Sequence, residues 1–382
     1  MKLTRLFNDF FHSEKSGGIV LIACTVLSIV LTNSGFQSGY LSIWNFEIAD
    51  HSVTHWINDG LMAIFFLLIG LELEREVYIG ELSSLTNSLL PIFAAIGGML
   101  VPAGIHFAIN SGTPTQPGAG IPMATDIAFA LGVLSLFGRN VPPPLKIFLT
   151  ALAVIDDLGA ILVIAIFYTG SLTWLYLLGA FGVLLFLFLL NRLKIYNLVP
   201  YLVGGIIMWY FMLHSGIHAT ITGVLLAFVI PFGNGSEKSP SFILQNFLHK
   251  PVAFIILPLF AMANTCLVIT PNWYQVLLET NSLGIILGLL AGKPIGITLF
   301  SYLSVKLKIS SVPEGLNFKK ILGAGFLGGI GFTMSIFITL LAFSDTSIIE
   351  QSKIAIMLAS MIAGAIGFMI LKVAGRFNKR IS

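Results

Sequence analysis

Residues 149–167 read LTALAVIDDLGAILVIAIF, an apolar stretch with two adjacent aspartates, Asp156 and Asp157, near its middle. An α-helix needs about 20 apolar residues to cross the hydrocarbon core of a bilayer. An ionised side chain at that depth costs roughly 2.5–3.5 kcal/mol on insertion scales, and such residues mark sites or pathways. This stretch therefore predicts a membrane-spanning helix that carries chemistry at its centre.

The whole chain has the composition of a membrane protein. Of its 382 residues, 56% are hydrophobic and only 10% are charged, whereas a soluble domain carries about 25% charged residues. A water-soluble enzyme is therefore excluded. Both cysteines, Cys24 and Cys266, lie inside apolar runs, which excludes a disulfide scaffold and leaves no metal-ligand spacing.

Apolar runs between polar breaks predict twelve transmembrane helices. The predicted spans are residues 17–33, 57–73, 88–109, 119–137, 145–168, 172–190, 198–213, 216–232, 251–269, 282–304, 320–343 and 352–372. These spans place every Lys and Arg except Lys293 and Lys353 on one side of the membrane. Since cytoplasmic loops carry the excess of basic residues, we expect an all-α integral membrane protein with both termini in the cytoplasm.

No connection is long enough for a soluble domain, so we expect residues 1–382 to form a single polytopic membrane domain. The connection 34–56 contains hydrophobic residues in near alternation, at Leu41, Ile43, Trp44, Phe46 and Ile48. This pattern favours a small hairpin outside the membrane. Its edge could pair with a second copy and give a homodimer, or the hairpin could simply cover the membrane face.

Five ionisable residues lie within or at the start of predicted spans: Asp156, Asp157, Asp126, Lys293 and Asp59. Two carboxylates in one low-dielectric site cannot both be ionised cheaply. Protons and a small hard cation can each supply the missing positive charge, and this competition is the basis of cation/proton exchange. Lys293 is the natural counter-charge, partnered by a carboxylate or by helix carbonyls, although a purely structural salt bridge is an alternative.

Two predicted spans carry helix-breaking residues in matching places. The fourth contains GAGIPMATDIAF (residues 118–129), and the eleventh contains GAGFLGGIGFTMSIF (residues 323–337). Unwound backbone is tolerated in a membrane only where protein or a cavity surrounds it. The fourth and eleventh spans are each the middle member of a three-helix unit, about 88–168 and 282–373. These two units run in opposite directions and predict an inverted repeat, with the remaining spans forming a second bundle.

Seven strings make the chain resemble the NhaA family of bacterial sodium/proton antiporters. They are WINDGLMAIFFLLIGLELERE (56–76), PMATDIAFALGVLSLFG (122–138), LTALAVIDDLGAILVIAIFYT (149–169), SGIHATITGV (215–224), LPLFAMANT (257–265), GKPIGI (292–297) and GFLGGIGFTMSIFI (325–338). The resemblance implies twelve transmembrane helices, with spans four and eleven unwound and crossing. Antiporters of this family are themselves among the transporters in which inverted repeats are known.

The resemblance also implies a function. The expected activity is electrogenic export of sodium or lithium across the bacterial inner membrane in exchange for more than one proton, by alternating access and under pH control. The expected partners are Na+, Li+, H+ and the bilayer, with no cofactor, no nucleic acid and no enzymatic reaction. The matching motifs imply that the ion and the protons bind at Asp157, Asp156 and Thr125, with Na+ or Li+ held at the two aspartates.

Further roles follow from the same resemblance. Asp126 and Lys293 compensate charge at the helix breaks, and Asp59 is the acid of the second span. The residues that correspond to the family's cytoplasmic entrance funnel and pH response are Glu72, Arg75, Glu76 and His218. A solvated helix end at Glu72–Glu81 and a simply packed His218 are alternatives from the residues alone.

The pH-sensing region departs from the family pattern, because Phe242 and Gln245 replace a lysine and a glutamate, and Glu74 replaces a basic residue. The pH profile is therefore not predicted. A proton-coupled transporter of another small solute on the same architecture is left open. A cation channel would need a filter motif, and the sequence contains none. An intramembrane aspartyl protease would need the motif GxGD, which is also absent. A purely structural role conflicts with the charged residues inside the predicted spans.

Overall fold

The computed structural model describes residues 14–138, 141–269 and 271–377. Within them, helices are joined by turns and loops, and one two-stranded sheet is present. Eight helices are long and apolar enough to cross a membrane: Val53–Tyr78, Ser88–Ile109, Gln116–Ser135, Pro143–Phe167, Trp174–Arg192, Pro240–Asn264, Thr280–Lys306 and Thr346–Gly375. Two bent pairs, Ser16–Thr32 with Gln37–Asn45 and Phe318–Gly328 with Phe332–Ala342, raise the number to ten.

The seventh predicted span, 198–213, coincides with helix α10 (Leu198–Leu213, 16 residues). The eighth, predicted over 216–232, contains only the seven-residue helix α11 (Ile221–Ala227). Both lie below the roughly 20 residues of a full span, so the count of twelve stays a prediction. The chain ends, on which the placement of both termini depends, lie outside the described residues.

The hairpin predicted for residues 41–48 is wrong over most of its length. Helix α3 (Gln37–Asn45) covers residues 41–45, and only β1 (Glu47–Ile48) and β2 (His51–Ser52) pair, with Glu47 opposite Ser52. Tyr40 and Trp44 are both buried and their rings meet edge to face at 5.7 Å. This four-residue spacing suits a helix face, and it outweighs the alternation of hydrophobic residues farther along. The edge available for pairing with a second copy is correspondingly short.

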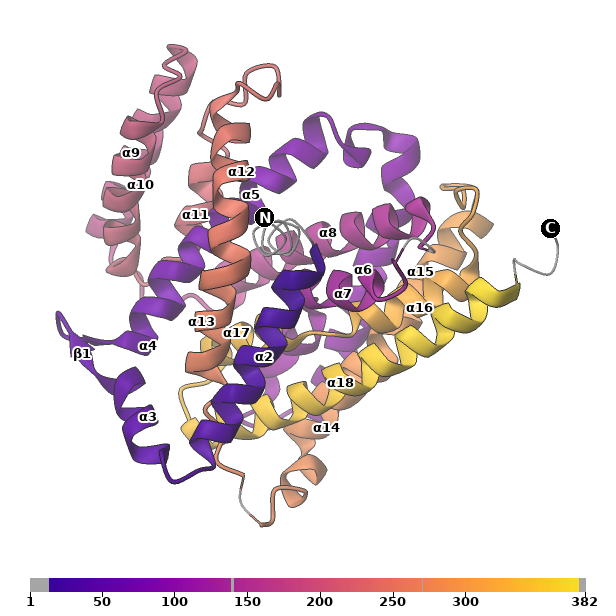
Figure 1. The fold of residues 1–382 in the computed structure, drawn as a ribbon. Helices are drawn as coiled ribbons and strands as arrows, with labels where there is room; N and C mark the ends of the chain where they lie inside the picture. Colours follow the sequence, from indigo (N-terminus) through magenta and orange to yellow (C-terminus); the bar gives the residue numbers. More distant parts are fainter. Residues whose placement is uncertain (1–13, 139–140, 270, 378–382) are drawn as a thin grey trace, which may run out of the picture. The chain divides into compact units, whose positions relative to one another are not determined.

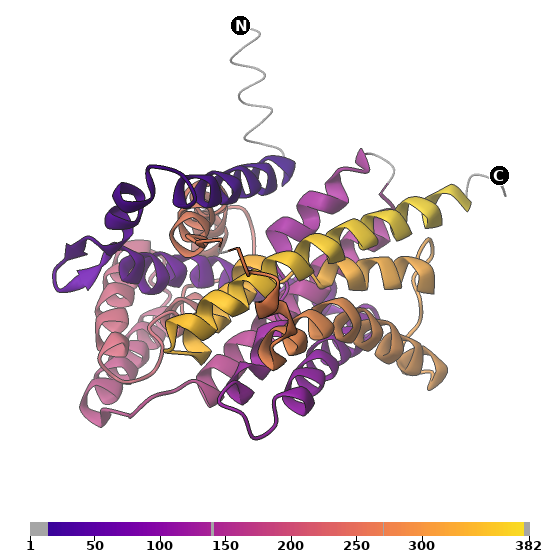
Figure 2. The same ribbon diagram turned by 90° about the horizontal axis from the view of Figure 1, so that it is seen from below.

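The chain divides into two compact units. The first comprises Met1–Gly35, Ser84–Ala160 and Thr265–Ser382. Its main helices are α2 (Glu14–Thr32), α6 (Leu85–Ile109), η3 (Gln116–Met123), α7 (Ile127–Ser135), the first part of α8 (Pro143–Phe167), α14 (Thr280–Leu287), η7 (Gly288–Gly292), α15 (Lys293–Lys306), α16 (Phe318–Gly328), α17 (Phe332–Ala342) and α18 (Thr346–Phe377). Helix α18 packs along α16 (Figures 1 and 2), and α15 packs most extensively on α6.

The second unit comprises Phe36–Ser83 and Ile161–Asn264. Its helices include α3, α4 (Val53–His55), η1 (Trp56–Leu61), α5 (Met62–Tyr78), η2 (Glu81–Ser83), α9 (Trp174–Arg192), α10, α11, α12 (Pro240–Pro251), η5 (Val252–Ile256) and α13 (Leu257–Asn264). Helix α5 packs on α11, and α9 runs beside α10 (Figure 1).

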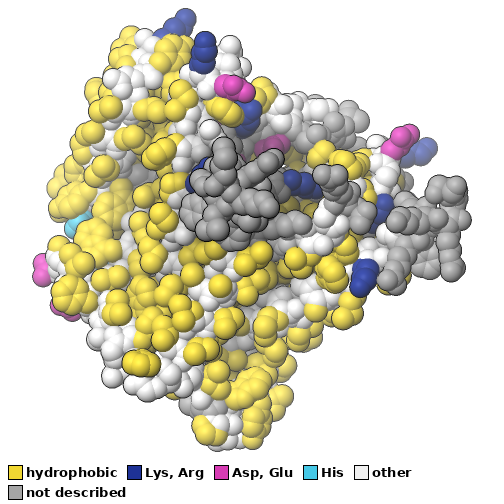
Figure 3. Space-filling view, viewed as in Figure 1, with side chains coloured by type: hydrophobic (Ala, Val, Ile, Leu, Met, Phe, Trp, Pro, Cys, Tyr) yellow, Lys and Arg dark blue, Asp and Glu magenta, His cyan; other side chains and the backbone are white. Residues whose placement is uncertain are grey.

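Large hydrophobic side chains are exposed on many helices, including Leu175 at 78% and Ile206 at 68%. Figure 3 shows a face on which hydrophobic side chains predominate and charged ones are few. Such extended apolar surface is expected where lipid, rather than water, surrounds the protein. The chain is therefore a multi-pass membrane protein.

Candidate functional site

Two helix interruptions within the first unit build the candidate site. The 3-10 helix η3 contains Gly118, Gly120 and Pro122, which disfavour regular α-helix, and it ends at Met123. Residues 124–126 are not helical, and α7 begins at Ile127. The second interruption is the glycine-rich segment 329–331, where α16 and α17 meet at a 49° bend.

The two interruptions bond directly to each other. The Asp126 N–H donates to the Ile330 carbonyl at 2.7 Å. One Asp126 carboxylate oxygen, Oδ1, accepts from the Phe129 N–H at 2.9 Å in the first turn of α7. The other, Oδ2, accepts from the N–H and the hydroxyl of Thr333 in the first turn of α17. A single carboxylate thus caps two helix N-termini, where negative charge is favourable.

Asp156 on α8 forms a buried ion pair with Lys293, the first residue of α15. The Lys293 Nζ lies 2.9 Å from Asp156 Oδ2, and both side chains have no exposed surface. The ammonium group also donates to the Met123 carbonyl at the end of η3. Thr125 Oγ1 lies 2.8 Å from Asp156 Oδ2 and 2.9 Å from the Gly328 carbonyl. Thr125 and Asp156 therefore join α8 to both interruptions.

Asp157 is the next residue of α8 and is completely buried. It lies close enough to Lys293 for electrostatic interaction. Asp156 Oδ1 has no hydrogen-bond partner among the described residues. The site therefore brings two carboxylates, one hydroxyl and several backbone carbonyls to the interruptions. Oxygen ligands of this kind suit a hard cation, and the same carboxylates can bind protons.

The residues at the C-terminal end of α5 belong to the second unit. Glu72 Oε1 lies 3.3 Å from His249 Nδ1 of α12. The Arg75 guanidinium lies over the Phe242 ring at 4.6 Å, so Phe242 meets a cation by its aromatic face. Glu74 is only 5% exposed, while Glu76 lies at the same helix end.

His218 and Asp59 lie near each other, at the N-terminal end of the η1–α5 segment. Asp59 Oδ2 lies 3.3 Å from His55 Nδ1, and the Asp59 carboxylate is also close enough to His218 for an electrostatic interaction. The His218 Nε2 lies 2.8 Å from the Tyr168 carbonyl. The structure thus places His218 with Asp59, at the opposite end of this segment from Glu72, Arg75 and Glu76.

Sequence reasoning missed three hydroxyl residues of the site. Thr333 binds Asp126, Ser335 Oγ donates to the Ile121 carbonyl at 2.7 Å, and Ser360 Oγ accepts from the Phe332 N–H at 3.1 Å. Thr333 and Ser335 stand out as polar residues in the string GFTMSIF, which was a usable signal. The carbonyls of Met123, Gly328 and Ile330 carry no sequence signal, because every residue has a carbonyl group.

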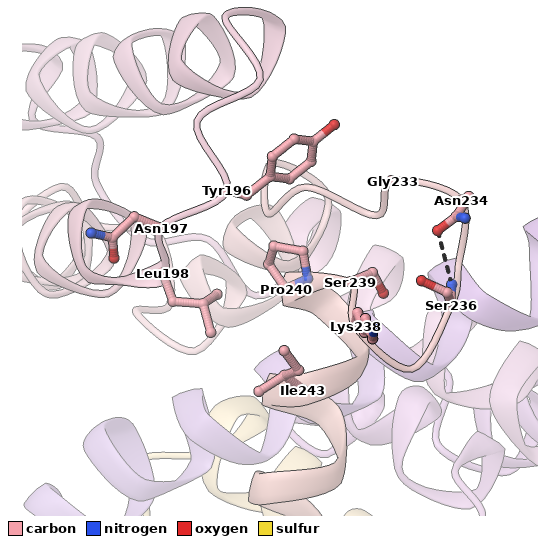
Figure 4. Close-up of a pocket in the computed structure, with 10 residues that line it drawn as sticks. All are labelled: Tyr196, Asn197, Leu198, Gly233, Asn234, Ser236, Lys238, Ser239, Pro240 and Ile243. Carbon is pink, nitrogen blue, oxygen red and sulfur yellow. Dashed lines mark hydrogen bonds between the residues drawn. The ribbon is translucent and has the colours of Figure 1, made fainter.

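A separate cavity of about 750 Å³ lies in the second unit, between residues 196–198 and 233–243 (Figure 4). Its lining includes Tyr196, Lys238 and Ser239, and the Asn234 side chain accepts from the Ser236 N–H at 3.3 Å. None of its lining residues is one of the predicted site residues. The predicted site residues therefore lie outside this cavity.

Comparison with known proteins adds two findings. A family model described as Na+/H+ antiporter 1 matches residues 8–371. The chain is 63% identical over 379 residues to the Na(+)/H(+) antiporter NhaA 1 of Flavobacterium johnsoniae, covering 99% of this chain and all of the relative. It is 64% identical over 372 residues to the NhaA antiporter of Flavobacterium psychrophilum, covering 97% of each. It is 60% identical over 372 residues to that of Cytophaga hutchinsonii, covering 97% of this chain and 96% of the relative.

Proposed function

The chain belongs to the Na+/H+ antiporter 1 family, and we propose that it exchanges Na+ or Li+, bound at Asp157 and Asp156, for protons bound at the same carboxylates. It is a secondary transporter and not an enzyme. The relatives are named for Na+ and H+. The finer steps below are our proposal for this chain.

One observation carries the proposal. Two adjacent buried carboxylates share a site with a single buried ammonium group, since Asp156 pairs with Lys293 at 2.9 Å and Asp157 is the next residue. With all three groups ionised, the site has one net negative charge in a medium of low dielectric constant. A bound Na+ neutralises it, and so does a proton. The two ligands therefore exclude each other, which couples their transport.

The bound ion is held by oxygen atoms from both sides of the interruptions. Asp157 provides the principal carboxylate, Asp156 provides Oδ1, and Thr125 provides its hydroxyl oxygen when the hydroxyl hydrogen points to Gly328. Asp126 and Lys293 stabilise the partial charges of the broken helix ends. These ends come from α7, α17 and η3, and they hold the site in place while the ion is partly dehydrated.

Two protons return for each sodium in this scheme. Asp157 carries one proton, and the Asp156–Lys293 pair carries the other as a coupled titrating unit. One net positive charge then enters per cycle, and a membrane potential of 100 mV contributes about 2.3 kcal/mol to each turnover. Each unit of pH difference contributes roughly 1.36 kcal/mol per proton.

Access to the site alternates between the two sides of the membrane. We propose twelve spans with both termini in the cytoplasm of a bacterium, and unwound fourth and eleventh spans that cross at the site. The inverted repeats at about 88–168 and 282–373 move relative to the other spans. Transport responds to pH through Glu72, Arg75 and Glu76 at the cytoplasmic end of α5 and through His218, with Phe242 altering that response.

Proteoliposomes with a preset pH gradient test the proposal. Addition of Na+ or Li+ dissipates the gradient with the wild-type protein, and Asp157→Asn abolishes this response because it removes one ionisable carboxylate. Asp345→Asn is the matched control, because Asp345 is exposed and its carboxylate accepts a local bond from the Ser347 N–H, two residues later. Sodium-dependent flux that persists in Asp157→Asn contradicts the assignment. If no alkali cation dissipates the gradient in the wild type, the alternative of another proton-coupled solute replaces it.

A further inference from the structure

Two apolar side chains, here called the apolar wall, lie one helical turn from the buried ion pair. Leu152 precedes Asp156 by four residues on α8, and Ile297 follows Lys293 by four residues on α15. Side chains at this spacing lie on the same face of a helix. Leu152 and Ile297 are both completely buried. The exchange scheme above gives neither of them a role.

Two glycines leave the space that Ile297 occupies. A Cβ built at Gly98 of α6 would lie 2.8 Å from Ile297 Cγ1 and 3.2 Å from Cδ1. A Cβ built at Gly328, the last residue of α16, would lie 3.3 Å from the same Cδ1. It would also lie 3.8 Å from Leu152 Cδ2 and 3.8 Å from Lys293 Cε. The δ-methyl group of Ile297 therefore packs against the bare backbone of both glycines.

This apolar contact borders the oxygen atoms of the ion site. The Cβ built at Gly98 would lie 3.9 Å from Asp156 Oδ1. That carboxylate oxygen has no hydrogen-bond partner among the residues that the structure describes. The Gly328 carbonyl lies 2.9 Å from Thr125 Oγ1. Both glycines that contact Ile297 thus also lie beside groups of the ion site, and all of these residues belong to the first unit.

A packed wall of this kind limits how far the oxygen ligands of an ion can move. Protein interiors are as dense as crystals of small organic molecules and are hardly compressible. Selection between hard cations depends on the size of the cavity, on the number of ligands and on their flexibility. Because Li+ is smaller than Na+ and Na+ is smaller than K+, a change of one methyl group in the wall affects the three ions unequally.

We propose that Ile297, held between Gly98 and Gly328, determines which alkali cation the exchanger prefers. This inference rests on the proposed exchange of Na+ or Li+ at Asp157 and Asp156. Ile297 is a positioning residue and not an ion ligand, since its side chain has no oxygen or nitrogen atom. A bulkier wall holds the ligands around a smaller ion, and a smaller wall lets them move apart around a larger ion.

Two substitutions change the wall in opposite directions. Gly98→Ala adds a methyl group against Ile297, and we expect the ratio of Li+ affinity to Na+ affinity to rise about tenfold. This is the lower end of the change that one methylene group causes in a packed pocket. Ile297→Val removes the δ-methyl group, so we expect that ratio to fall by a similar factor and K+-driven proton flux to appear. Cation titrations in proteoliposomes with a preset pH gradient give the apparent affinities.

Matched controls lie on the same two helices. Gly104→Ala on α6 adds a methyl group that meets no atom within 4 Å. Ile295→Val on α15 removes a δ-methyl group from a side chain that is 53% exposed. Both variants should keep the wild-type ratio of cation affinities.

The double variant Gly98→Ala/Ile297→Val separates this role from general damage to the structure. The added methyl group then faces the space that the lost δ-methyl group leaves, so we expect the cation ratio to return toward the wild-type value. Such recovery is a coupling between residues in contact. Two unrelated structural losses would instead lower flux further for every cation and would leave their ratio unchanged.

Each outcome decides the inference. Opposite changes in the two single variants and recovery in the double variant support it. Ratios that stay constant, or that move in the same direction in both single variants, overturn it and leave the proposed exchange intact. If Gly98→Ala does not fold, the ratio in Ile297→Val decides alone. If no alkali cation drives flux in the wild type, or if Asp157→Asn retains the flux, the proposed exchange fails and this inference fails with it.

Discussion

Thr125 carries one hydroxyl hydrogen, yet two oxygens lie within hydrogen-bond distance of it, on Asp156 and Gly328. The hydroxyl can donate to only one of them at a time. When it donates to Asp156, it stabilises the ionised carboxylate of the empty site. When it donates to Gly328, its oxygen is free to bind a cation. This small rearrangement lets one side chain serve both states of the site.

The Thr125 hydroxyl is therefore expected to determine sodium affinity. Thr125→Val keeps the shape of the side chain but leaves the buried Gly328 carbonyl without this donor, a loss of about 1–3 kcal/mol. We expect the apparent affinity for Na+ to fall about tenfold or more, since 1.4 kcal/mol corresponds to a factor of ten. Thr125→Ser retains the hydroxyl and is the control. Equal sodium affinity in the valine and serine variants would exclude this role.

The ion pair between Asp156 and Lys293 should also affect the thermal stability of the protein. Removing one partner of a buried pair costs about 3–5 kcal/mol, whereas replacing both can be nearly neutral. We expect Asp156→Asn and Lys293→Gln each to lower the Tm in detergent, and the double variant to lose less than the two single losses combined. Additive losses in this double-mutant cycle would show that the two groups do not interact in solution.

At the residue scale, the sequence identified the participants but not their pairings. Asp126, Asp156, Asp157 and Lys293 stand out because a charge inside an apolar run has few structural explanations. Sequence alone left Lys293 with either a carboxylate or helix carbonyls as partner, and the structure gives it both, Asp156 and the Met123 carbonyl. That choice depends on which helices meet in space, which no local pattern encodes.

At the scale of helices, the close contact of α6 and α15 positions Lys293. A Cβ added at Gly296 would lie 2.1 Å from the Gly97 carbonyl oxygen, so the two backbones touch at this point. Lys293 is one turn earlier on the same helix. Any side chain at position 296 must therefore separate α15 from α6 and move the Lys293 ammonium relative to Asp156.

A pair of alanine substitutions tests this contact. Gly296→Ala is expected to lower both the Tm and the rate of sodium-driven proton flux, because neither backbone can yield as a flexible side chain would. Gly104→Ala on α6 is the matched control, since a Cβ there meets no atom within 4 Å. Alanine favours the helix by up to about 1 kcal/mol over glycine, so this variant should be unchanged or slightly more stable. If Gly296→Ala keeps the wild-type Tm and flux, α6 and α15 are farther apart than the structure places them.

The helix interruptions could be foreseen at this scale, but helix α3 could not. Gly118, Gly120 and Pro122, and the glycines before Phe332, disfavour helix by their own backbone chemistry. Residues 41–45 show apolar residues at spacings compatible with both strand and helix. The burial of Tyr40 and Trp44 on one face decides for the helix, and burial of this kind depends on neighbours distant in the sequence.

For the whole molecule, hydropathy predicted a membrane protein but did not predict how the chain divides into two compact units. The first unit joins three separate stretches of chain, and both helix interruptions with all of the proposed ion ligands lie within it. Periodicity is a local property, so it cannot show that residues near 125, 156 and 330 come together. The matching positions of the two glycine-rich breaks were the one sequence feature that suggested it.

Voltage dependence tests the proposed exchange as a property of the complete transporter. With two protons returning per sodium, one charge crosses per cycle, so sodium export should accelerate with a potential that is negative on the cytoplasmic side. In Lys293→Gln, Asp156 loses its ammonium partner and stands beside Asp157 in a buried site. We expect it to stay protonated throughout the cycle, because two uncompensated carboxylates cannot both ionise there cheaply.

The variant would then return one proton per sodium, on Asp157 alone, and its transport would be electroneutral. Proteoliposomes in which a potassium gradient and valinomycin set the potential can measure this, with sodium flux recorded at fixed pH on both sides. The wild-type rate should change with the potential, and the Lys293→Gln rate should not. If the variant keeps the wild-type voltage dependence, Asp156 alone exchanges the second proton. Lys293 would then act only by holding that carboxylate and the Met123 carbonyl in place.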